Sequence, residues 1–152
     1  MLLAMNCGCI VEFGVRTGRS TRAFAAGLKG ALFSYDIADP KGEMPKNTDQ
    51  FEWLFTKANT AFLKSIPDCD LLFIDTLHAE SQVMAELRHA PSVRKWIVLH
   101  DTYLFGEYGE DQSGERGIGY AISAFLRENS ECWRKVYVTN ACNGLTILER
   151  IA

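Results

Sequence analysis

The sequence predicts an α/β fold of the doubly wound, Rossmann-like kind, with a mostly parallel sheet and an antiparallel hairpin near its C-terminal end. Short apolar runs alternate with stretches of helical periodicity, which is the order expected when helices connect parallel strands. The run 10–13 leads into two glycines and then a helical stretch, as in a strand, a tight turn and a helix start. Two strand-like runs flank Asn143-Gly144, which is typical of an antiparallel pair at a sheet edge.

The first third of the chain is expected to hold three strands. The first strand covers 7–13, a helix covers 20–28, and the second strand covers 31–36. The stretch 38–50 contains prolines and a glycine without apolar periodicity, so a long surface loop is expected there. Aromatic and β-branched residues over 51–57 favour a third strand over the alternative, the start of a helix.

The rest of the chain is expected to continue the alternation. A short helix over 61–66 should stop before Pro67. The continuous apolar runs 71–74 and 96–99 are typical of central parallel strands that are buried on both faces. The other predicted elements are a helix over 79–88, a Gly-rich acidic loop over 105–116, a helix over 118–128 and hairpin strands over 133–139 and 145–148.

Composition and charge limit the classes of protein. The 152 residues, 47% hydrophobic and 23% charged, predict one globular domain over 1–152. The net charge of -3 and the lack of a Lys/Arg cluster argue against a nucleic-acid partner. Neither a signal peptide nor an apolar run of about 18 residues is seen, so we expect a cytoplasmic protein without a membrane partner. Five cysteines without a C-x-x-C pair predict buried free thiols rather than disulfides or a zinc site.

The first polar motif is Glu12-x-Gly14-x-x-x-Gly18, between a predicted strand and a predicted helix. Glycines let the chain bend sharply and lie against a ligand, and Ser20 or Thr21 is expected to cap the helix. A dinucleotide fingerprint has three glycines at closer spacing, and the carboxylate of Glu12 would repel a pyrophosphate. The motif therefore favours an adenosine-containing cofactor with cationic groups, and an ordinary strand-to-helix turn is the alternative.

Four predicted strands end in polar residues, and ligands of open α/β sheets bind beyond such ends. The residues concerned are Glu12, Asp36, Asp75, His78, His100 and Asp101. Because these ends meet along one edge of the sheet, we expect a shared crevice, although each acid taken alone is also typical of a loop. Asp36 has roughly the spacing of an acid that binds ribose.

Some of these residues are candidates for chemistry. Asp75 and Asp101 should converge, either to bind a divalent cation or to leave one acid with a raised pKa. His100 is a third metal ligand or a hydrogen-bonded histidine at a strand end. His78 is a general base near pH 7 or a cap of the next helix. His89 follows a predicted helix and is expected on the surface, favoured by the helix dipole.

Three further segments extend the pattern: Phe73–His78, Trp96–Thr102 and Asn143–Arg150. Together with 12–21 they resemble the class I S-adenosylmethionine (SAM) dependent methyltransferases, of the group that includes the cephalosporin-hydroxylase-like and macrolide sugar O-methyltransferases. The matched motifs occur in the same order and span nearly the whole chain. The resemblance implies methyl transfer to an oxygen of a sugar or another small hydroxylated molecule, with SAM and Mg²⁺ as cofactors.

The resemblance also implies roles for single residues. The implied cofactor contacts are Glu12, Gly14 and Gly18 at the methionine end, Ser20 and Thr21 beside them, Asp36 at the ribose, Asn59 and Thr60 at the adenine, and Asp75. Mg²⁺ would be bound by Asp75, His100 and Asp101. His78 would be the general base, with Asp75 beside it in the catalytic set.

The chain departs from these relatives in three ways. They carry helices before the first strand, where this sequence has six residues before its first predicted strand. The loop 38–50 stands in place of a helix, and His100 and Asn59 stand where relatives carry acids. The missing cover would come from a second subunit of a homo-oligomer or from the loop 105–116. The rival functions are a non-catalytic binding or assembly module and an enzyme that uses NAD or a nucleotide sugar.

Overall fold

The computed structural model describes residues 3–110 and 114–152, which form one seven-stranded sheet in the order β3-β2-β1-β4-β5-β7-β6. The strands are β1 (Cys9–Phe13), β2 (Gly30–Asp36), β3 (Phe51–Lys57), β4 (Cys69–Ile74), β5 (Val93–His100), β6 (Trp133–Thr139) and β7 (Leu145–Arg150). Strands β1 to β5 run parallel, whereas β7 runs antiparallel to both β5 and β6. The predicted fold class, including the antiparallel C-terminal hairpin, is confirmed.

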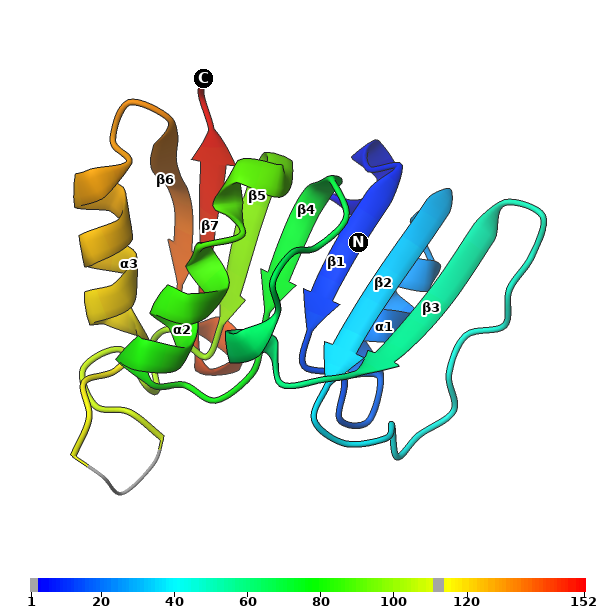
Figure 1. The fold of residues 1–152 in the computed structure, drawn as a ribbon, viewed down its shortest axis with the longest axis horizontal. Helices are drawn as coiled ribbons and strands as arrows, with labels where there is room; N and C mark the ends of the chain where they lie inside the picture. The colour runs from blue at the N-terminus through cyan, green and yellow to red at the C-terminus, as the bar shows by residue number, and fades with distance from the viewer. Residues whose placement is uncertain (1–2, 111–113) are drawn as a thin grey trace.

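Helices cover both faces of this sheet (Figure 1). The α-helices are α1 (Arg19–Ala25), α2 (Glu80–Leu87) and α3 (Ile118–Glu128), and the short 3₁₀ helices are η1 (Ala4–Asn6), η2 (Thr60–Phe62), η3 (Ala90–Ser92) and η4 (Ala141–Asn143). Helix α1 lies on one face, while α2 and α3 lie on the other. In the described part of the chain, no helix is long and apolar enough to cross a membrane. The strand order reverses between β1 and β4, so a crevice is expected below the ends of these two strands.

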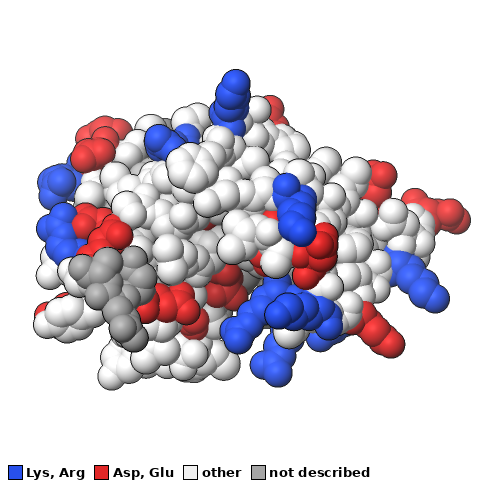
Figure 2. Space-filling view, turned by 60° about the horizontal axis from the view of Figure 1, so that its bottom comes forward, with Lys and Arg blue, Asp and Glu red and all other residues white. Residues whose placement is uncertain are grey.

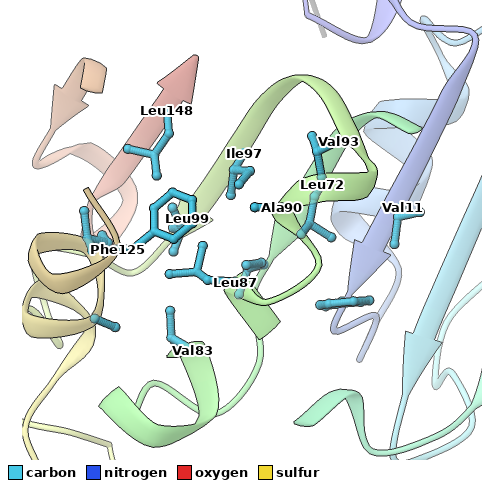
Figure 3. Close-up of a cluster of buried hydrophobic side chains, with 14 of the residues drawn as sticks. Val11, Leu72, Val83, Leu87, Ala90, Val93, Ile97, Leu99, Phe125 and Leu148 are labelled. Carbon is cyan, nitrogen blue, oxygen red and sulfur yellow. The ribbon is translucent and has the colours of Figure 1, made fainter. Parts of the chain in front are cut away.

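The larger core lies between the central strands and the helices α2 and α3 (Figure 3). It includes Leu72 of β4, Leu99 of β5, Val83 and Leu87 of α2, and Phe125 of α3. Each of these side chains is at most 5% exposed. Burying a large apolar side chain contributes roughly 1.5–3 kcal/mol, so this layer fixes the positions of β4 and β5. A smaller cluster packs α1 against the opposite face of the same strands.

Helix α1 differs from the prediction at both ends. It covers Arg19–Ala25, so it starts one residue earlier and ends earlier than expected. Its N-cap is Gly18, at φ +70°, and no side chain of the described residues caps it. The prediction that Ser20 or Thr21 caps this helix is therefore wrong. The hydroxyl of Thr21 donates to Glu12 instead, because the first turn of the helix packs against the end of β1.

Between β2 and β4, the predicted loop and strand are present, whereas the predicted helix is not. The strand over 51–57 is confirmed as β3, and 38–50 is confirmed as a loop. The helix predicted over 61–66 is wrong, because the chain makes only the single turn η2. It becomes extended again at Leu63, and proline at position 67 then prevents a helix from continuing.

All five cysteines are free thiols, as predicted. Cys7 and Cys69 are buried, and burial raises the pKa of the Cys69 thiol to about 12, which leaves it unreactive at neutral pH. Cys142 is exposed, so the expectation of buried thiols is wrong for this residue. It lies in η4, in the surface turn between β6 and β7, where it has φ +51°.

Candidate active site

The turn after β1 joins the ends of three strands. Gly14 has φ +89°, and a Cβ at this position would lie 1.9 Å from the backbone oxygen of Asp75. The N–H of Gly14 donates to Tyr35 O at 2.9 Å, and the N–H of Asp75 donates to Phe13 O at 2.9 Å. Only glycine fits at this position. The close approach of its backbone allows the carboxyl ends of β1, β2 and β4 to meet at one rim of the sheet.

Glu12 is completely buried at the end of β1. Its Oε2 accepts hydrogen bonds from Thr21 Oγ1 at 2.8 Å and from Ser34 Oγ at 2.6 Å. Its Oε1 has no hydrogen-bond partner within the described ranges. Burial raises the pKa of Glu12, and the neighbouring hydroxyl groups oppose this shift without cancelling it. Glu12 thus ties β1 to β2 and α1 and has one buried acceptor oxygen without a hydrogen bond in the described structure.

Asp36, at the end of β2, binds the turn after β1. Its Oδ2 accepts from the N–H groups of Val15 at 2.8 Å and Arg16 at 2.9 Å, and its Oδ1 accepts from Ala38 at 3.1 Å. Burial alone would raise the pKa of Asp36, but these backbone donors lower it below its ordinary value. Asp36 therefore lies where the sequence places it, and its role at a ribose stays a prediction.

The loop between β2 and β3 lies against the same turn. The guanidinium of Arg22, on α1, donates to the backbone oxygens of Thr17 at 3.0 Å and Glu43 at 2.9 Å. A Cβ at Gly18 would lie 2.3 Å from Cε of Met44. Cε is the end of a flexible side chain and can move, so glycine at position 18 is favoured by its φ of +70° rather than by this contact. The sequence did not indicate that this loop lies against the turn.

Asn59 and Thr60 lie on the segment that leaves β3. Asn59 Oδ1 accepts from the N–H of Ala61 at 3.0 Å and so caps η2. Thr60 is only 3% exposed, and its hydroxyl donates to the carboxylate of Glu86 on α2. The Thr60 side chain therefore faces the protein interior, and a contact of this segment with adenine stays a prediction.

Asp75, His78 and Asp101 form a compact cluster beyond β4 and β5, with candidate ligand atoms all within 4.8 Å of one another. His78 Nε2 lies 3.3 Å from Asp75 Oδ1 and 3.5 Å from Asp101 Oδ2. Burial would raise the pKa of Asp75, but His100 and His78 hold it well below its ordinary range. The two aspartates converge as predicted, because β4 and β5 are neighbours in the sheet.

His100, the last residue of β5, faces the same aspartates. Its Nδ1 lies 2.8 Å from Asp101 Oδ1 and 3.6 Å from Asp75 Oδ1. Nδ1 of His100 and Oδ1 of Asp101 are buried and form an ion pair with each other, although in the part of the chain that the structure describes neither makes a hydrogen bond of acceptable geometry. Two carboxylates and one imidazole are a donor set that suits a divalent cation.

Glu110 is a member of the site that sequence reasoning missed. Its Oε2 lies 2.6 Å from His78 Nδ1, and the ring of Phe105 stacks on the His78 ring at 4.8 Å between centroids. Burial lowers the pKa of His78, but Asp75 and Glu110 outweigh this effect and raise it. The alternative that His78 caps the next helix is wrong, because the N-cap of α2 is Ala79. The sequence shows an acidic loop here, but not which of its acids turns inward.

His89 is buried rather than on the surface, so that prediction is wrong. It is 8% exposed, and its ring packs edge-on against Phe13, with 5.8 Å between centroids. Burial and the charge of Arg88 lower the pKa of His89. His89 is the N-cap of η3, so the chain turns immediately after it. The imidazole therefore packs against β1 and does not point into solvent.

The predicted residues gather at one rim of the sheet. The rim contains Glu12, Gly14, Gly18, Asp36, Asp75, His78, His100 and Asp101, while Ser20 and Thr21 lie beside Glu12. Seen from this end, Asp and Glu side chains gather near the middle of the molecule, and Lys and Arg side chains gather beside them (Figure 2). Among the described residues, the ion-pair partners of Asp75 and Asp101 are histidines.

Comparisons with known proteins agree with this arrangement. A family model described as a methyltransferase domain matches residues 11–102. The structure is similar to N-methyltransferase NodS from Bradyrhizobium japonicum WM9 in complex with S-adenosylhomocysteine, with 14% identity, a TM-score of 0.64, and coverage of 99% of this chain and 84% of that one. It is also similar to the O-methyltransferase TomG from Streptomyces achromogenes in complex with SAM, with 16% identity, a TM-score of 0.65, and coverage of 99% and 77%. No curated protein matches the chain. At these identities the solved structures establish the fold.

Proposed function

The chain belongs to the methyltransferase-domain family, whose model covers more than half of it, and we propose that it transfers a methyl group from SAM to a hydroxyl oxygen. The proposed acceptor is a sugar or another small hydroxylated molecule. The observation that carries this proposal is the cluster of Asp75, His78 and Asp101 next to the glycine turn. An imidazole held in place by neighbouring carboxylates can act as the general base that takes the proton from a hydroxyl group.

The residues around the turn after β1 fit SAM. Gly14 and Gly18 give the turn its shape, and Glu12 Oε1 is a buried acceptor that suits an ammonium group. Asp36 would accept from the ribose hydroxyls in exchange for its bonds to backbone N–H groups. SAM supplies a methyl group on a positively charged sulfur, which an oxygen nucleophile can take in one step. The solved complexes of the same fold with SAM and S-adenosylhomocysteine support this assignment.

We assign the general base to His78. With Glu110 accepting from Nδ1–H, Nε2 is the nitrogen that takes the proton. Its contacts with Asp75 and Asp101 favour the protonated ring and raise the pKa of His78, so the base acts once the ring has lost its second proton. Phe105 covers one face of the ring and fixes its orientation. The acceptor hydroxyl gives its proton to Nε2, and the alignment of the reacting groups contributes most of the remaining rate enhancement.

We propose that Asp75, His100 and Asp101 bind Mg²⁺. The support for an ion is the convergence of the Asp75 and Asp101 carboxylates with the imidazole of His100 at the ends of β4 and β5. A divalent cation would lower the pKa of a hydroxyl group bound to it. Treatment with EDTA should abolish activity and lower the melting temperature, and added Mg²⁺ should restore both. A protein indifferent to EDTA and Mg²⁺ in both measurements would contradict the metal site.

A small acceptor is favoured over a nucleic acid by the charge at the rim. The carboxylates of Asp75, Asp101 and Glu110 surround the proposed base, and the chain carries a net charge of -3. Phosphate groups would be repelled from this position. We further propose that a second subunit or the loop 105–116 covers the acceptor during the reaction.

Calorimetry tests the proposed cofactor directly. Heat with S-adenosylhomocysteine and none with NAD is expected, followed by transfer of a labelled methyl group from SAM to members of a panel of sugars and small hydroxylated compounds. Heat with NAD alone would establish the nucleotide-using rival. Heat with neither would favour a non-catalytic binding module, in which Asp36 keeps its bonds to the turn after β1.

A further inference from the structure

Glu86 is a buried carboxylate on the face of α2 that packs towards the sheet. It is completely buried, and a buried acid is costly unless donors satisfy it. It accepts from the hydroxyl of Thr60, from the hydroxyl of Thr76 at 2.8 and 3.0 Å, and from Nε2 of Gln82 at 2.7 Å. Two of these donors lie outside α2, so Glu86 links the helix to two other segments.

Both segments border the proposed cofactor crevice. Thr76 lies at the exit of β4, within the cluster region. Thr60 lies in η2, on the segment that leaves β3, passes below the carboxyl ends of β2 and β1 and lies beside α2 before the chain enters β4 (Figure 1). In the sheet, β2 and β1 lie between β3 and β4, so β3 and β4 do not pair with each other. The position of the connecting segment that carries Thr60 is therefore not fixed by strand pairing. Arg88 of α2 adds a hydrogen bond to the backbone oxygen of Ala61 at 3.1 Å.

We propose that Glu86 is a positioning residue for the cofactor, which sets the shape of the adenosine end of the crevice by fixing Thr60 relative to Thr76. This inference rests on the proposed function. Oε1 of Glu86 accepts from Thr60, Thr76 and Gln82, so one oxygen holds both threonines, and Thr76 also reaches Oε2 at 3.0 Å. A glutamine could keep its carbonyl oxygen at the position of Oε1 but would lose the negative charge, which weakens the hydrogen bonds to both threonines. Hydrogen bonds to a carboxylate are also roughly twice as strong as those between neutral groups.

Three variants test this role. Glu86→Gln keeps the size of the side chain and removes one acceptor, and Thr60→Val removes the hydroxyl from the crossing segment at nearly constant volume. Val83→Ala is the matched control, because Val83 is equally buried on α2 but belongs to the apolar core. For each variant we would measure the Kd for S-adenosylhomocysteine by calorimetry, the KM for SAM, kcat at saturating SAM, and the melting temperature.

Glu86→Gln and Thr60→Val should each raise the Kd and the KM about tenfold, as expected when a buried hydrogen bond is weakened or lost. Their kcat at saturating SAM should stay within about threefold of the wild type. Val83→Ala should lower the melting temperature and leave the Kd unchanged. A Kd within about twofold of wild type in Thr60→Val would overturn the proposal, even if Glu86→Gln failed to fold. A wild-type protein that does not bind S-adenosylhomocysteine would overturn the proposed function as well, which separates the two failures.

Discussion

Strand β4 carries one aspartate near its start and another directly after its end. At the start, Asp70 accepts from the N–H groups of Gly8 at 2.7 Å and Cys9 at 3.3 Å. Its other oxygen pairs with Arg94 at 3.1 Å and Lys95 at 3.4 Å. These partners hold the pKa of Asp70 at about 2, against the burial that would raise it. Asp70 is thus neutralised by two cations that keep their charge at any physiological pH.

Asp75, after the end of the same strand, is surrounded by histidines. His78 and His100 contact it at 3.3 and 3.6 Å, and the carboxylate of Asp101 lies within the same cluster. Histidines change charge near neutral pH, and a metal ion can take over their role as the positive partner. The comparison shows that one strand carries a permanently charged ion pair at its amino end and a carboxylate paired with histidines at its carboxyl end, where we propose that the chemistry takes place.

Of the predicted changes at the two ends of β4, removal of the proposed base His78 should have the largest effect on turnover. His78→Ala should lower turnover by about 10³-fold, because the other imidazole that faces the paired acids, His100, contacts them through Nδ1 and is a proposed metal ligand. The affinity for S-adenosylhomocysteine should stay within a few-fold of wild type in calorimetry. His89→Gln alters a buried histidine outside the cluster and should retain turnover per folded molecule. Unchanged turnover in His78→Ala would exclude the role of general base.

The turn that fixes the carboxyl end should be sensitive to a single methyl group. Gly14→Ala should lower the free energy of unfolding by about 3 kcal/mol, because it adds a clash with the Asp75 backbone to the strain of a positive φ. Gly114→Ala is the control: it has φ +80°, and no atom of the described residues lies within 4 Å of its Cβ. It should cost about 1 kcal/mol. Equal losses for the two variants in urea unfolding would refute the close approach at Gly14.

The amino end should affect stability and leave activity unchanged. Asp70→Asn should reduce the free energy of unfolding at pH 7 by about 1–2 kcal/mol, since the folded pKa of about 2 lies below the unfolded value of 3.8. The contribution of Asp70 is present above pH 3.8 and is lost as the pH falls towards 2. Denaturant titrations should therefore show wild type and variant converging at low pH. A difference that persists at pH 2, or a loss of methyl transfer, would contradict this assignment.

The sheet and its rim could be predicted because local signals agreed with the global fold. The apolar runs of β4 and β5 end directly in Asp75 and in His100-Asp101, and parallel strands place such ends together. The position of Gly14 also followed from local chemistry, because only glycine tolerates its φ and its contact. The strand ends and the glycine turn depend on the spacing of residues along the chain, which can be read from the sequence.

Other features of the site depend on contacts between segments that are distant in the sequence. The hydrophobic periodicity of the sequence does not predict such contacts. Glu110 approaches His78 from 32 residues further along the chain, beyond α2 and β5, and His89 is buried by its contact with Phe13 of β1. Glu86 did leave a signal, because it lies on the same stripe of α2 as Val83 and Leu87. A charged residue on an apolar helix face indicates a buried acceptor, although it does not reveal which donors reach it.

The loop between β2 and β3 is attached to its surroundings largely through main-chain atoms. The N–H of Lys41 donates to Arg16 O, and the two acceptors of the Arg22 guanidinium are backbone oxygens. Such bonds do not depend on which side chains the loop carries. Homologues should therefore vary at the positions of this loop whose side chains make no contact, whereas Gly42 should be kept, because a Cβ there would lie 2.5 Å from the backbone oxygen of Thr17. The contact-free positions are a natural place to attach a reporter group.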